Sequence, residues 1–279
     1  MLALQSNWTR PFFVRNPGRE YTIEDFDLLT TVLSALEWRR HNGRIVMAAD
    51  EEAARFYRER SLLALWDEVV MLTVPQTLDP DIFWAAGKLY ALGKFSAPLV
   101  MMDTDFIVWE KIPFELIGCD AAAVHREELY PDVYPDPGSF SMKEGYRFGD
   151  RWDWDSPAFN TAFVYFRDPA FLRRYLAEAY RFMENAREPD NFLTYMVFAE
   201  QRMMGLLRGE GFRVEAFSSL DRLFSGGGCF THTWGFKEQM RRNERARRLF
   251  CEKCANRIRA DFPEWAEILR KDADLCKFF

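Results

Sequence analysis

Residues 97–108 read Ala-Pro-Leu-Val-Met-Met-Asp-Thr-Asp-Phe-Ile-Val and carry the strongest indication of the fold. The run 97–102 is apolar and has the length of a buried strand, and two carboxylates, Asp103 and Asp105, follow it at once. Open α/β sheets bind their ligands at the carboxyl ends of such strands. Because two carboxylates two residues apart can converge on one hard divalent ion, we expect a metal site here.

Upstream of this segment, apolar runs alternate with helical patterns. Strands are expected at 1–5, 44–49 and 68–74, and helices at 22–40, 51–59 and 80–95. Thr22-Ile-Glu-Asp25 has the form of a capping box that opens the first helix. Strands that alternate with helices at this spacing predict an α/β fold with a mostly parallel sheet flanked by helices.

Downstream, the pattern is less regular. A strand is expected at 163–166, with helices at 169–184, 191–208 and 238–260, and a flexible glycine turn at 225–228. Residues 130–157 are rich in turns and aromatic residues, which favours a binding loop over a core element. We therefore expect one domain over 1–237, with 238–279 as a helical C-terminal extension of the same domain.

Composition limits the class of protein. The 279 residues contain 37 Lys and Arg against 43 Asp and Glu, a formal charge of −6, which argues against nucleic acid as a partner. No apolar run approaches the roughly 18 residues that a membrane span requires, and the N-terminal residues 5–7 are polar. Five scattered cysteines suit a reducing compartment. We expect a soluble, cytoplasmic protein without a transmembrane segment.

Three motifs together resemble one family. Residues 97–108 resemble the Asp-x-Asp segment of glycosyltransferases with the nucleotide-diphospho-sugar transferase fold, called GT-A. Phe159-Asn-Thr-Ala-Phe-Val164 is similar to the asparagine-containing strand that these enzymes place over donor and acceptor. His232-Thr-Trp-Gly-Phe-Lys237 is similar to the His-x-x-Gly element of the glycogenin-like retaining branch. The order of the motifs fits over most of residues 1–237.

The resemblance implies a set of site residues. Asp103, Asp105 and His232 would hold Mn²⁺ or Mg²⁺ against the diphosphate of a nucleotide-sugar donor, with a UDP-sugar favoured. Lys237 and Lys88 would supply cations to the phosphates. The further donor-binding residues expected are Ser6, Trp8, Asn160 and Gly235, with Trp8 placed to stack on the base.

The sequence also departs from the family's pattern. Lys237 follows Gly235 by two positions instead of three, Glu238 and Gln239 replace the customary Pro-Trp, and Ala162 stands where Gly is commoner. These departures concern the assignment of Lys237 as a phosphate-binding residue and the assignment of the reaction as retaining. An inverting reaction needs a general base, for which Glu200 and Asp190 are candidates. A retaining reaction could instead use same-face attack assisted by the leaving phosphate, and the residues leave both routes open.

The activity that the resemblance implies is hexosyl transfer to a glycan or lipid-linked acceptor in polysaccharide biosynthesis. One alternative is a catalytically degenerate sugar-nucleotide-binding protein. A nucleotidyltransferase would normally have a glycine-rich phosphate loop after the first strand, and residues 5–10 contain no glycine. A non-enzyme alternative is an interaction module stapled by zinc through Cys229-x-x-His232 and Cys251-x-x-Cys254.

Two further features have ordinary interpretations as well as functional ones. The basic run Arg241–Arg248 reads as a solvated helix face, and its functional alternative is contact with an anionic lipid-linked acceptor at a membrane surface. His41 and His125 are expected to be polar surface residues.

Overall fold

The computed structural model of the chain describes residues 1–187, 191–224 and 228–279. Among these residues, seven strands form one sheet in the order β10-β6-β9-β4-β1-β2-β3. Only β9 in this sheet runs antiparallel to its neighbours, β4 and β6, so the sheet is mostly parallel as predicted. The strands are β1 (Ala3–Asn7), β2 (Ile45–Ala49), β3 (Glu68–Met71), β4 (Leu99–Met102), β6 (Ala121–Ala123), β9 (Phe163–Phe166) and β10 (Val214–Ala216).

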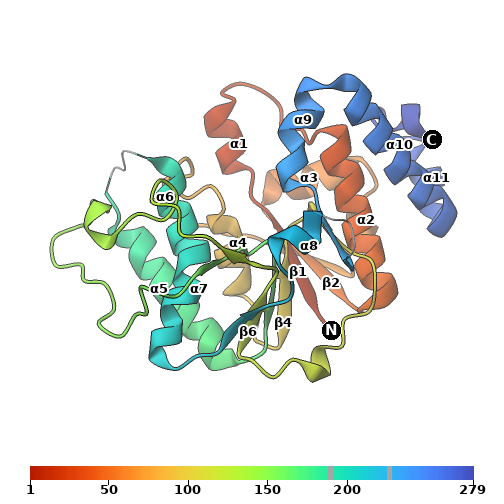
Figure 1. Cartoon of the computed structure of the whole chain (residues 1–279). Helices are drawn as coiled ribbons and strands as arrows, with labels where there is room; N and C mark the ends of the chain where they lie inside the picture. The colour runs from red at the N-terminus through yellow and green to blue at the C-terminus, as the bar shows by residue number, and fades with distance from the viewer. Residues whose placement is uncertain (188–190, 225–227) are drawn as a thin grey trace.

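Both faces of the sheet are covered by helices, which places the sheet at the centre of the molecule (Figure 1). Along β4, Val100 and Met102 pack into one hydrophobic core, and Leu99 and Met101 into the other. Successive side chains of a strand point to opposite faces, so a strand buried on both sides reads as a continuous apolar run. This is why β4 was readily predicted from the sequence.

The helices separate into two groups (Figure 1). α4 (Ala86–Leu92), α5 (Pro169–Asn185), α6 (Phe192–Val197) and α7 (Met203–Leu206) contribute to one core. α2 (Asp25–His41), α3 (Glu51–Glu59), α9 (Lys237–Arg242), α10 (Glu244–Asp261) and α11 (Pro263–Leu269) contribute to the other. The remaining α-helices of the described residues are α1 (Arg10–Arg15) and α8 (Leu220–Phe224). None of the helices in the described residues has the length and apolarity that crossing a membrane requires.

Several predicted boundaries are wrong for local reasons. The predicted capping box does not form. The N-cap residue of α2 is Glu24, not Thr22, and its side chain makes no capping hydrogen bond. The helix predicted over 191–208 is interrupted by a turn of π-helix, Phe198–Arg202. The helix predicted over 238–260 breaks at Asn243, whose extended backbone and side-chain bond to the Ala246 N–H cap α10.

The aromatic segment 130–157 packs into the protein more than the sequence suggested. Phe140 and Trp152 are buried in the core shared with α5 and α7. The Trp154 ring stacks on Phe198, with centroids 6.1 Å apart. The interpretation as a binding loop is therefore wrong for these anchoring residues, whose rings fill a hydrophobic core.

Two small antiparallel ribbons lie beside the main sheet. β5 (Phe106–Val108) pairs with β11 (Phe230–His232), so that His232 lies opposite Phe106. β7 (Arg126–Glu127) pairs with β8 (Ala158–Phe159), the strand that precedes Asn160. These ribbons bring segments far apart in the chain to the carboxyl end of β4.

Candidate metal and donor site

Asp103 and Asp105 lie in a tight turn at the carboxyl end of β4. The Asp103 N–H donates to the Ala162 carbonyl over 2.8 Å, and the Phe106 N–H donates to the Asp103 carbonyl over 3.1 Å. The turn is therefore fixed by its own backbone and by the neighbouring strand β9. Both carboxylates project at the sheet edge where α/β folds bind ligands.

The ribbon of β5 and β11 brings His232 to this turn. The Thr233 N–H donates to the Asp105 carbonyl over 3.2 Å, and His232 Nε2 lies 3.7 Å from Asp105 Oδ1. One ligand atom from each of Asp103, Asp105 and His232 lies within 4.8 Å of the others. In the described residues this is the one group of three side chains that could hold a metal ion.

Lys88 of α4 lies against Asp103. Its Nζ is 2.6 Å from Asp103 Oδ1 and 2.5 Å from Glu200 Oε1, and it also donates to the Thr161 carbonyl over 3.2 Å. Glu200 is 2% exposed and also accepts from the Thr161 hydroxyl over 2.7 Å. The π-helical turn thus holds Glu200 as a buried anchor for Lys88.

Lys237, the first residue of α9, lies on the other side of the cluster. Its Nζ is 2.9 Å from Asp105 Oδ2 and 3.0 Å from Asp27 Oδ1. Asp27, in the first turn of α2, was not predicted as a site residue. Nothing in its local sequence distinguishes it from other acidic residues at helix starts, since its partner comes from the opposite end of the chain.

The charges of the cluster do not cancel. Four carboxylates, Asp27, Asp103, Asp105 and Glu200, face two ammonium groups, Lys88 and Lys237, which leaves a formal charge of −2 when all four carboxylates are ionised. Burial raises the pKa of Asp103 to about 7, and Asp105 and Glu200 act in the same direction against Lys88. The Asp103 carboxyl is therefore partly protonated near pH 7, and a cation bound beside it would favour its ionised form.

The ionisation states of the other two ligands also suit a cation. Burial lowers the pKa of His232 to about 4, so its imidazole is neutral near pH 7 and keeps a lone pair for a metal. Burial acts to raise the pKa of Asp105, but Lys237 and His232 outweigh it and hold the pKa below its usual value. Two carboxylates and a neutral imidazole fit a hard divalent ion such as Mn²⁺ or Mg²⁺.

The remaining predicted donor residues lie at this end of the sheet or close to it. Ser6 is in β1, in register with Ala48, and Trp8 follows that strand. Trp8 packs on the helix of Lys88 so closely that a Cβ on Gly87 would lie 2.6 Å from the Trp8 Cβ.

Asn160 and Gly235, the other two predicted donor-binding residues, lie outside the strands and differ in exposure. Asn160 is 7% exposed, donates to Glu127 over 2.9 Å and accepts from the Ala162 N–H. Gly235 lies in an exposed 3-10 turn, Trp234–Phe236. Asp190 lies outside the described residues. The structure thus brings Lys88, Lys237 and Glu200 to the three candidate ligands.

One alternative and one expectation are wrong. Cys229, Cys251 and Cys254 do not join His232 in any potential metal group of the described residues. Cys251 and Cys254 are buried on α10, and the Cys251 thiol donates to Asp25, so the zinc-stapled module is not formed. His125 is only 3% exposed, because it follows buried β6 and the buried Val124, and its carbonyl accepts from the Asn160 N–H.

Glu127 was missed by the sequence analysis. Its carboxylate accepts from Asn160 and lies 3.8 Å from His125 Nε2. The ribbon of β7 and β8 makes this contact, and no local motif marks it. A polar group of Glu127, His125 and Asn160 therefore lies at the strand predicted to cover the donor and acceptor.

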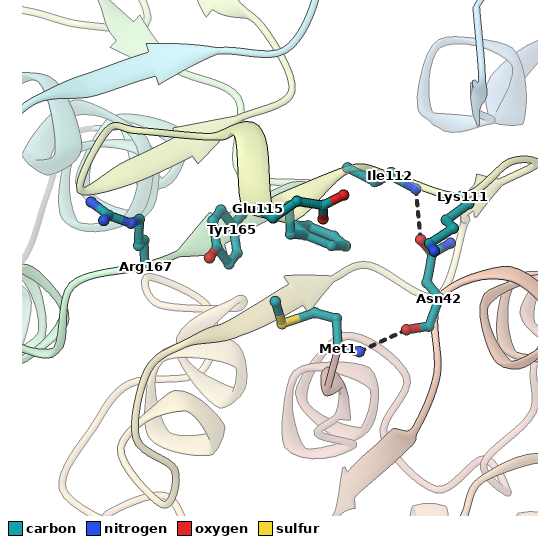
Figure 2. Close-up of a pocket in the computed structure, with 8 residues that line it drawn as sticks. Met1, Asn42, Lys111, Ile112, Glu115, Tyr165 and Arg167 are labelled. Atoms are coloured by element: carbon teal, nitrogen blue, oxygen red, sulfur yellow. Dashed lines mark hydrogen bonds between the residues drawn. The ribbon is translucent and has the colours of Figure 1, made fainter.

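Two cavities lie away from the cluster. One of about 400 Å³, shown in Figure 2, is lined by Met1, Asn42, Lys111 and Arg167, among others. Because Met1 and Asn42 precede β1 and β2, this cavity is at the amino end of the sheet, opposite Asp103. The second, of about 420 Å³, lies between Asp25, Met240 and the basic run.

The basic run is largely ion-paired. Arg241 lies 2.7 Å from Glu24, Arg242 lies 2.8 Å from Glu238, and Arg247 lies 2.7 Å from Asp25. Arg248 lies 2.9 Å from Glu252. The pairs of Arg241 and Arg247 hold α9 and α10 against the start of α2, and the other two pairs each lie within one helix, which favours the structural interpretation of the run.

Comparison with known proteins gives similarity in structure alone. No family model and no curated protein matches the chain. Similar solved structures include a nucleoside-diphosphate-sugar pyrophosphorylase from Vibrio cholerae RC9, with 14% identity, TM-score 0.42, and coverage of 79% of this chain and 93% of that one. Mouse xyloside xylosyltransferase 1 is 14% identical, with TM-score 0.39 and coverage of 76% and 83%. The galactosyltransferase LgtC is 14% identical, with TM-score 0.37 and coverage of 77% and 73%.

Proposed function

We propose that the chain is a metal-dependent glycosyltransferase that moves a sugar from a nucleotide-diphosphate donor to a glycan or lipid-linked acceptor. One observation carries the proposal: Asp103, Asp105 and His232 converge at the carboxyl end of the sheet, between the buried Lys88 and the partly exposed Lys237. The excess of carboxylates over lysines suits a divalent ion, and the lysines suit a second anionic ligand. A nucleoside diphosphate bound with a divalent ion combines these two requirements.

In this proposal the residues have distinct tasks. Asp103, Asp105 and His232 hold the ion, which when bound neutralises charge that develops on the leaving diphosphate. Lys237 turns its ammonium toward the same diphosphate, since it is the more exposed of the two lysines, with 26% of its side chain accessible. Lys88 is held in place by Glu200 and Thr161 and fixes Asp103, so it acts mainly as a positioning residue.

The donor and acceptor lie against the rest of this edge. Trp8 is placed to contact the donor's base, Ser6 and Gly235 line the donor, and Asn160 orients its sugar or the acceptor through the contact with Glu127. Glu200 anchors Lys88 in its buried position, so Asp190 stays the candidate for a general base in an inverting reaction. The acceptor and its place in polysaccharide biosynthesis stay predictions from the resemblance.

The test is release of nucleotide from a panel of UDP-, GDP-, CMP- and dTDP-sugars, with Mn²⁺ or with a chelator. The proposal expects Mn²⁺-dependent release from one nucleotide class, and its loss in Asp105→Asn. Asp155→Asn is a matched control, because Asp155 is an exposed aspartate outside the cluster. Metal-independent release, or full activity in Asp105→Asn, would overturn the assignment. Binding of one sugar nucleotide without release would favour the degenerate alternative.

A further inference from the structure

The Lys237 ammonium contacts a carboxylate for which a divalent ion would compete. Its Nζ lies within 3.0 Å of both Asp105 Oδ2 and Asp27 Oδ1, so one ammonium is shared by two carboxylates. The exposed fractions of the two carboxylate side chains are 11% and 19%, so solvent screens these charges only in part. A cation bound at Asp105 would therefore lie close to a like charge.

We propose that Lys237 competes with the divalent ion for Asp105, and that Asp27 is a positioning residue that retains the lysine when the ion binds. The proposal rests on the proposed function and concerns how that site is loaded. When an ion is held by Asp105, Lys237 turns from this carboxylate toward the diphosphate of the donor, with Asp27 as its remaining fixed partner. The ion and a nucleoside diphosphate then bind cooperatively. The ion releases the Lys237 ammonium from Asp105 for the diphosphate, and the diphosphate neutralises the ammonium that would otherwise repel the ion.

The local structure permits this movement. Lys237 is the first residue of α9, which has six residues and follows an exposed 3-10 turn, and a lysine side chain is a flexible four-carbon stem. Asp27, in contrast, belongs to α2, whose neighbouring residues Phe26 and Leu28 are fully buried. The anion that retains the lysine is thus fixed, and the lysine is the movable partner.

Lys88 does not share this behaviour. It is 9% exposed and is held by Asp103, Glu200 and a backbone carbonyl. The cluster therefore has one fixed cation and one movable cation. This difference assigns the coupling between ion and diphosphate to Lys237.

The test is calorimetric titration of the full chain with Mn²⁺, alone and with saturating UDP, in wild type and Lys237→Met. Methionine keeps the approximate length of the side chain and removes its charge. We expect Lys237→Met to bind Mn²⁺ alone about tenfold more tightly, because a like charge near the ion is gone. The factor by which UDP increases Mn²⁺ affinity should fall by about tenfold.

Three further variants sharpen the experiment. Lys237→Arg keeps the cation and should resemble wild type. Asp27→Asn should weaken the binding of Mn²⁺ alone in the wild-type background and have a smaller effect in the Lys237→Met background, which a double-mutant cycle measures. Lys111→Met is the charge-matched control, since Lys111 lines the cavity at the opposite end of the sheet (Figure 2).

The outcomes separate this inference from the proposed function. If wild type binds Mn²⁺ and Lys237→Met binds it equally or more weakly, the competition is overturned and the metal site stands. If wild type does not bind Mn²⁺ with or without UDP, the metal site fails and the inference fails with it. Circular dichroism of each variant establishes that the binding constants compare folded proteins.

Discussion

At the scale of single residues, His232 links the site to acid stability. Burial lowers the pKa of His232 to about 4 in the folded chain, whereas a histidine in the unfolded chain has a pKa of about 6.5. Between these values the unfolded chain binds more protons, so His232 lowers stability progressively as the pH falls. Its contribution to the free energy of unfolding should decrease by about 2 kcal/mol from pH 7.5 to pH 5.

The variant His232→Gln tests this, because glutamine does not titrate in that range. Urea unfolding of both proteins near pH 7.5 and near pH 5 should show that wild type loses about 2 kcal/mol more than the variant on acidification. Equal losses in the two proteins would mean that His232 is not held neutral by burial. The comparison between variants removes the titration of carboxylates that do not contact His232.

At the scale of elements, α7 must approach the segment before β8 very closely. A Cβ added to Gly205 would lie 2.0 Å from the Pro157 carbonyl oxygen, so Gly205→Ala forces backbone to move. We expect a loss of about 1–3 kcal/mol in unfolding free energy, despite the higher helix propensity of alanine. Gly118→Ala is the control, since a Cβ there meets nothing within 4 Å. Equal stability of the two variants in urea would contradict this packing.

The elements also show what local sequence could and could not predict. β4 and its two aspartates were predictable because a strand buried on both faces is a continuous apolar run. α3 was predicted with its observed bounds, and its first turn is capped by the Asp50 side chain. The break at Asn243 was missed, because the long charged pattern on both sides favoured one helix.

The residues of the candidate site also include some that the sequence predicted and some that it did not. Asp103 and Asp105 were predicted as ligands because they follow a buried apolar run, and His232 was added by the resemblance to the family; the structure brings the three side chains together. Asp27 and Glu127 were not found, because their roles come from contacts with Lys237 and Asn160 that only the folded chain makes. His125 was predicted as exposed, because a single histidine after the short run Ala121–Val124 carries no local signal of burial.

At the scale of the whole molecule, we propose that residues 238–279 belong to the same domain as 1–237. Cys251, Ile258 and Trp265 lie in the same hydrophobic core as residues of α2 and β2, and Arg257 lies 3.4 Å from the buried Glu37. A chain that ends at residue 243 should therefore lose cooperative thermal unfolding and bind a hydrophobic dye. A truncated chain that unfolds at the wild-type midpoint would instead make the segment an independent appendage.

The central claim is that Asp103, Asp105 and His232 hold a divalent ion for a nucleotide-sugar donor. The most direct measurement is a thermal-shift panel of UDP-, GDP-, CMP- and dTDP-sugars with and without Mn²⁺, in wild type and in Asp105→Asn. The account predicts a rise of about 5 °C or more for one nucleotide class, only with Mn²⁺ and only in wild type, because a ligand that binds the native state stabilises it. No shift with any nucleotide, or the same shift in Asp105→Asn, would contradict it.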